Sequence, residues 1–122
     1  MEILDLKCAQ LAEKLAGTGG KDVENALAQA LDVLEEQGVY AFFLFLSDPG
    51  SQHGKATSRE CLQFLQRTPQ ENPLLKPQGD GFKALQSLAA NLDDLLLARD
   101  LLRQALVYAR YHARARTGES EK

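Results

Sequence analysis

The sequence predicts an all-α, single-domain bundle of five to six helices with a long basic C-terminal helix. Apolar residues recur at helical spacing along most of the 122 residues. Clusters of glycine and proline divide these segments, and no segment alternates apolar and polar residues as a half-buried strand does. A chain of this length has room for one domain and one core.

The composition is that of an ordered globular protein, with 44% hydrophobic and 25% charged residues. The last six positions, 117–122, contain no apolar residue. We therefore expect a helical domain over residues 1–116 and a frayed tail over residues 117–122.

The first two helices are predicted by their apolar stripes. A stripe that begins at Leu4 predicts a helix over residues 2–16, which Gly17 and the glycines after it end. We expect Asp22 to cap a second helix that stops at Gly38. Its stripe follows the helical template closely and consists of Val23, Ala26, Leu27, Ala30, Leu31 and Leu34.

The aromatic run over residues 39–46 is ambiguous, because a short apolar run is compatible with a buried strand or a buried helix. Its length favours a strand. A strand, however, needs neighbours for its backbone donors and acceptors, and no second segment resembles one. We therefore predict a buried central helix.

A turn-rich loop over residues 48–54 should precede the fourth helix. Thr57 and Glu60 have the capping-box spacing, which predicts that this helix covers residues 58–67. Prolines at positions 69, 73 and 77 exclude regular helix from the next stretch, where Leu74 and Leu75 should attach the loop to the core.

Two further helices should complete the chain. We expect Asp80 to cap the fifth, with Phe82, Leu85, Leu88 and Ala89 facing inward. Asn91, with Asp94 three residues later, should open a last helix over residues 92–116.

Catalysis and cofactor binding have little support in the residues. Cys8 and Cys61 lie in apolar helical patterns without metal-ligand spacing, so we interpret them as small core residues. His53 and His112 have no identifiable partner for acid or base work, and adjacent helical residues such as Asp93 and Asp94 point about 100° apart. We expect no enzyme activity, no cofactor and no metal.

The N-terminus does not resemble an export signal, because acidic residues precede any apolar stretch. The longest apolar run, over residues 39–46, is also much shorter than the roughly 20 residues of a membrane-spanning helix. A cytoplasmic protein that neither spans a membrane nor binds a small-molecule substrate is the expectation.

Charge is unevenly distributed along the chain. Residues 1–50 contain three basic and nine acidic residues, whereas residues 51–122 contain eleven basic and eight acidic ones. Such asymmetry suggests head-to-tail contacts or a nucleic-acid face. At 100° per residue, four arginines of the last helix share one narrow stripe, a pattern that suits either a phosphate backbone or a solvated face balanced by acids: Arg99, Arg103, Arg110 and Arg114.

Two segments, residues 30–47 and 92–116, resemble the small all-helical subunit of the Cmr effector complexes, the type III-B CRISPR machinery. The likeness lies in Gln37-Gly38 at the end of an apolar helix, Phe45-Leu46 at the end of an aromatic helix, and the basic segment 108–113. Lys7-Cys8-Ala9 is similar to the family's opening. Gln37 stands where asparagine is usual, and Tyr108 where tryptophan is expected.

The resemblance implies a non-catalytic subunit that stacks on copies of itself and on other effector subunits and helps to hold crRNA and target RNA. Base readout is not expected, because guide pairing reads the sequence in such systems. Candidate contacts to the RNA backbone are the four arginines of the stripe, with Lys55 and Arg59 as loop-side candidates.

Two alternatives stay open. The small subunit of the related Csm complexes shares the same general features. A stand-alone helical adaptor or regulator, dimerising through Phe42, Phe43 and Phe45, would instead use the arginines to pair with acidic protein.

Overall fold

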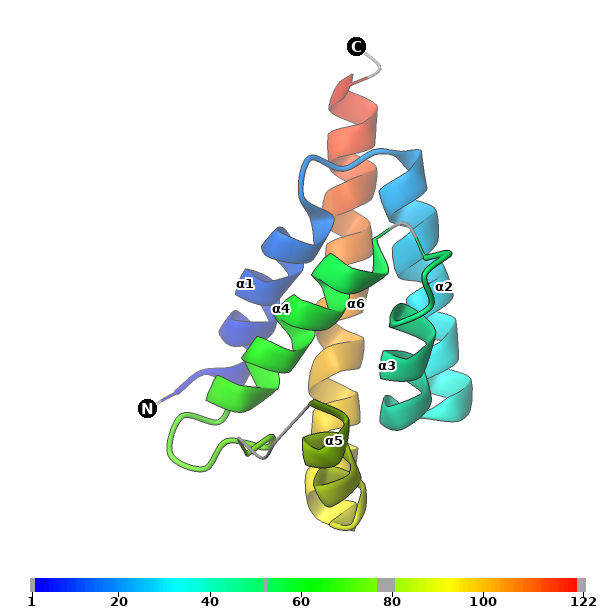
Figure 1. The fold of residues 1–122 in the computed structure, drawn as a ribbon. Helices are drawn as coiled ribbons and strands as arrows, with labels where there is room; N and C mark the ends of the chain where they lie inside the picture. The colour runs from blue at the N-terminus through cyan, green and yellow to red at the C-terminus, as the bar shows by residue number, and fades with distance from the viewer. Residues whose placement is uncertain (1, 52, 77–80, 121–122) are drawn as a thin grey trace.

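The computed structural model describes residues 2–51, 53–76 and 81–120, and these residues form an all-helical bundle (Figure 1). The elements are α1 (Leu4–Ala16), α2 (Lys21–Gln37), α3 (Val39–Leu46), α4 (Gly54–Arg67), α5 (Gly81–Ala89) and α6 (Leu92–Ser120). No strand occurs in these ranges, and none of their helices is long and apolar enough to cross a bilayer. The predicted fold class is confirmed.

The long helix α6 lies at the centre of the bundle. It spans 29 residues and packs against α1, α2, α3 and α5. In Figure 1 it runs the full height of the molecule, with α1 to its left, α2 and α3 to its right, and α4 crossing in front of it in this view. Its buried face includes Ala98, Leu101, Leu102, Ala105, Leu106, Ala109 and Ala113.

Helix α3 is the buried helix predicted for the aromatic run. Val39, Phe42, Phe43 and Leu46 belong to the core, and the rings of Phe42 and Phe43 meet edge to face at 5.0 Å. Gly38 separates α3 from α2 with a φ of 97°, a backbone conformation that residues with a side chain rarely adopt. The sharp turn at this glycine lets two consecutive helices pack against each other.

Three predicted helix details are wrong. Gly20 rather than Asp22 precedes α2, and Asp22 lies in the first turn, where its charge complements the helix dipole. Thr57 does not cap α4, because that helix begins at Gly54 and Thr57 is buried inside it, donating its backbone N–H to the His53 carbonyl. Ala89 of α5 is exposed, and Ala84 instead joins Leu85 and Leu88 in the core.

The loop after α4 follows the expected design. Leu74 and Leu75 are buried, and the Leu75 N–H donates to the carbonyl of Leu65 in α4 at 3.1 Å. The expected contributions of Pro77 and Asp80 fall on residues outside the described ranges.

The last helix begins as predicted and ends later. Asn91 Oδ1 accepts the Asp94 N–H at 3.1 Å, so Asn91 caps α6. The helix then continues past Arg116 to Ser120, into the segment expected to be frayed.

The core contains both cysteines as unpaired thiols, as expected. Burial raises the pKa of Cys8 to about 11, with a smaller contribution from Asp5. Burial also raises the pKa of Cys61, to which Glu60 adds. Both thiols therefore stay protonated at neutral pH.

Candidate nucleic-acid interface

The arginine stripe of α6 faces α2, the most acidic helix of the bundle. Arg103 Nε lies 2.8 Å from Glu35 Oε1, and Arg114 Nε lies 3.0 Å from Glu24 Oε1. Arg99 Nη2 donates to the backbone carbonyl of Glu35 at 3.2 Å. Three of the four predicted arginines are therefore engaged with a neighbouring helix of the same chain.

The fourth arginine of the stripe differs from the others. Arg110 is half-buried, and its Nε has no hydrogen-bond partner among the described residues. Burying an unsatisfied guanidinium nitrogen is unfavourable, so this side chain gains from any acceptor that reaches it.

The two ion pairs leave part of each guanidinium in solvent. The side chains of Arg103 and Arg114 are 56% and 64% exposed, and each ion pair uses Nε. A guanidinium carries five N–H donors, so both arginines keep donors for a second anion. The neighbouring carboxylates nevertheless offset much of the positive field.

Lys55 and Arg59 lie away from the contact between the arginine stripe and α2. Both are exposed on α4, one turn apart, and they line a hollow with Leu46 and Leu62. Helix α4 packs against α1 and α3, whereas the stripe meets α2. The structure does not bring these two candidates together with the arginine stripe.

Sequence reasoning missed a second group of cations, on the opposite side of α6. Lys7 and Lys14 of α1 and Arg67 of α4 line one groove between these helices, which we call the α1–α4 groove. Gln10 and Gln63 add amide groups to its walls, and it encloses about 160 Å³. The spacing of Lys7, Gln10 and Lys14 places them on one helical face, but only the fold adds Arg67.

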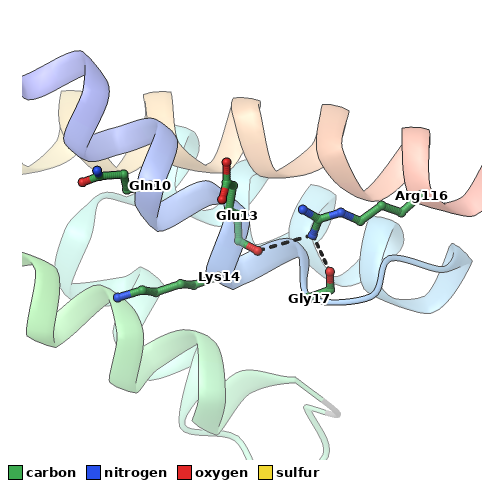
Figure 2. Close-up of a pocket in the computed structure, with 5 residues that line it drawn as sticks. All are labelled: Gln10, Glu13, Lys14, Gly17 and Arg116. Atoms are coloured by element: carbon green, nitrogen blue, oxygen red, sulfur yellow. Dashed lines mark hydrogen bonds between the residues drawn. The ribbon is translucent and has the colours of Figure 1, made fainter.

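Arg116 extends this basic surface beyond the groove. Figure 2 shows its guanidinium reaching from α6 to the end of α1, where it donates to the carbonyls of Glu13 and Gly17. Lys14 and Gln10 line both this hollow and the α1–α4 groove, so the two adjoin. The Glu13 carbonyl also accepts the Gly17 N–H at 3.3 Å, so Arg116 supplies a second donor at the end of α1.

The remaining candidate residues are apart from one another. His53 precedes α4, whereas His112 is half-buried on α6. No group of three or more His, Cys, Asp or Glu side chains suited to a metal occurs among the described residues.

Comparison with known proteins finds no matching family model, no similar curated protein and no similar solved structure.

Proposed function

We propose that this chain is a non-catalytic small subunit of a Cmr-type RNA-guided effector complex. In this role it acts in the cytoplasm, stacks on copies of itself and on other subunits, and helps to hold crRNA and target RNA for antiviral defence. The resemblance of residues 30–47 and 92–116 is the basis of the proposal.

The observation that carries the proposal furthest is the match between the resembling segments and the helices. The first segment contains the C-terminal half of α2 and all of α3, which meet at Gly38, and the second segment lies within α6. This is the order of helices that the resemblance implies. It supports the proposal at the level of architecture.

Contact with RNA would use the outer edge of the stripe. Arg103 and Arg114 are held in place by their Nε pairs with α2, while their remaining donors face solvent in part. A cation that is already oriented loses less side-chain entropy when it binds a phosphate. Such contacts are independent of base sequence.

The test compares two variants of the assembled complex that break the same ion pairs from opposite sides. Arg103→Ala with Arg114→Ala removes the cations, whereas Glu24→Gln with Glu35→Gln keeps them and removes the acids. We expect the arginine variant to weaken RNA binding and to flatten its salt dependence by about 0.7 per lost contact on a log–log plot. The glutamate variant should bind RNA at least as tightly as the wild type.

Equal losses in both variants would show that the ion pairs act only through the fold. The membership of the chain in such a complex is tested separately, by co-expression with the other effector subunits and a crRNA. Failure of the chain to co-purify with them would contradict the proposed function, regardless of how the arginine variant binds RNA.

The adaptor alternative loses its expected surface. Phe42 and Phe43 are in the core and Phe45 is half-buried, so this cluster offers no aromatic face for dimerisation. The exposed apolar pair Leu92 and Leu96, one turn apart on α6, is the surface that such a role would use instead. Concentration-dependent dimerisation that Leu92→Gln abolishes would favour the adaptor.

A further inference from the structure

The α1–α4 groove brings together cations that pair with no carboxylate among the described residues. Lys7, Lys14 and Arg67 are exposed, and none forms an ion pair or side-chain hydrogen bond with a described residue. The stripe on α6 differs in this respect, because Glu24 and Glu35 neutralise two of its arginines. In a chain with a formal charge of −3, the groove therefore brings together three positive charges that no described carboxylate pairs with.

The geometry points to the α1–α4 groove as a binding site for the phosphodiester backbone of a single-stranded nucleic acid. Lys7 and Lys14 stand two turns apart on α1, about 10 Å along its axis, with Arg67 across from them on α4. Cations on both walls can approach successive phosphates of one strand. The amides of Gln10 and Gln63 supply further donors for phosphate or sugar oxygens.

Acidic residues lie nearby but are outnumbered. Glu13 lines the adjoining hollow with Arg116, and Glu2 and Glu71 line a separate hollow on the Lys7 side. Within the groove itself, three cations, Lys7, Lys14 and Arg67, face the carboxylate of Glu60. The surface therefore keeps a net positive charge and favours a polyanion.

The groove has the composition of a nucleic-acid surface rather than of a protein interface. Its apolar members, Leu11 and Phe64, are buried in the floor and belong to the core. Protein interfaces depend on exposed aromatic or aliphatic anchors, which the groove lacks. Positively charged and polar surfaces are instead typical of contacts to phosphates.

This inference rests on the positions of the cations and not on membership in an effector complex. It also assigns backbone contact to a surface other than the arginine stripe. The two surfaces lie on opposite sides of α6, one along α1 and the other along α2.

The experiment measures binding of the full chain to a mixed-sequence single-stranded RNA across a range of salt concentrations. The wild type should bind with a Kd in the range of about 10⁻⁴ to 10⁻⁶ M, as expected for sequence-independent contact. Lys7→Gln with Lys14→Gln should lower affinity roughly 25-fold at 0.1 M salt and reduce the salt slope by about 1.4. Lysine and glutamine have similar helix propensities, so the helical content should not change.

Two matched variants isolate the groove from overall charge. Lys21→Gln with Lys76→Gln removes the same charge from exposed positions outside the groove and should have a much smaller effect. Lys7→Arg with Lys14→Arg keeps the charge and should keep the binding. A single-stranded DNA of the same sequence tests whether the ribose contributes, because the phosphodiester is common to both.

Several outcomes would overturn the inference. One is wild-type protein that fails to bind the RNA at low salt, and another is equal weakening by the groove variant and its charge-matched control. Equal binding to polyglutamate would show that the groove recognises acidic polypeptide instead. None of these results depends on whether the chain co-purifies with effector subunits, so the two proposals fail separately.

Discussion

The thiol of Cys8 lies in the core, where it donates to the backbone carbonyl of Leu101 in α6 at 3.4 Å. Its pKa is raised to about 11, mainly by burial. Above pH 9 the unfolded chain loses the thiol proton while the folded chain keeps it, so ionisation favours unfolding. The stabilising effect of the neutral thiol is complete below pH 9 and is lost as the pH rises toward 11.

We therefore expect the free energy of unfolding to fall between pH 9 and 11, and to fall less steeply in Cys8→Ala than in the wild type. Denaturant titrations at several pH values give the two slopes. The comparison is of slopes rather than absolute stabilities, because the substitution also removes core volume. Parallel slopes would show that Cys8 does not contribute to the alkaline transition.

Gly54 has a different constraint, because a Cβ at this position would collide with the Leu46 carbonyl oxygen and with Ser51. Backbone cannot move aside as a flexible side chain can. Gly54→Ala should therefore destabilise the protein by about 1–3 kcal/mol, the usual cost of overpacking. A Cβ at Gly50, in the loop just before α4, would meet only Asp48 Oδ1 at 3.5 Å, so Gly50→Ala should change stability by less than about 0.5 kcal/mol. Chemical denaturation of both variants checks this difference.

At the scale of the element, α6 holds the bundle together through its apolar face. Leu102 is completely buried, whereas Leu96, also on α6, is 45% exposed. Leu102→Ala should cost about 2–5 kcal/mol of folding free energy. Leu96→Ala should cost about 0.5 kcal/mol or less. Similar losses in thermal or chemical unfolding would contradict the assignment of the buried face.

The helices themselves could be predicted because their apolar stripes are local. The helical state of residues 39–46 follows from the absence of a second segment that could pair with them as a strand. Gly38 marks the start of this helix. The caps were harder, since Asp22 and Thr57 have capping chemistry but lie inside helices whose starts depend on glycine and on loop packing. Local sequence does not distinguish a cap from a first-turn residue.

The candidate site could be predicted only in part. The arginine stripe on α6 can be predicted from helical periodicity alone, because all four arginines lie on one helix. Its neutralisation by Glu24 and Glu35, and the meeting of Arg67 with Lys14, depend on contacts between residues far apart in the sequence. No helical periodicity reports such contacts.

Across the whole molecule, contacts within the fold neutralise part of the uneven charge along the chain. The acidic helix α2 packs against the basic helix α6, and the ion pairs between them are partly exposed. Exposed pairs contribute about 0–1 kcal/mol each. The charge asymmetry of the sequence therefore reflects internal packing as well as any external partner.

Stability of the whole domain should depend on neither metal nor disulfide, because both cysteines are buried as free thiols in the helical core. Melting temperatures with and without chelator, and with and without reductant, should agree. A clear decrease with chelator would reveal a bound metal. A decrease with reductant would reveal a covalent cross-link.

The central position of α6 also affects the order in which the protein can fold during synthesis. Helices α1 and α2 both pack against α6, which leaves the ribosome after the helices described before it. A nascent chain that stops before Leu92 exposes the faces of α1 and α2 that α6 covers in the folded bundle. Such a chain should be digested rapidly by proteases, and it should become resistant only once α6 has emerged from the exit tunnel.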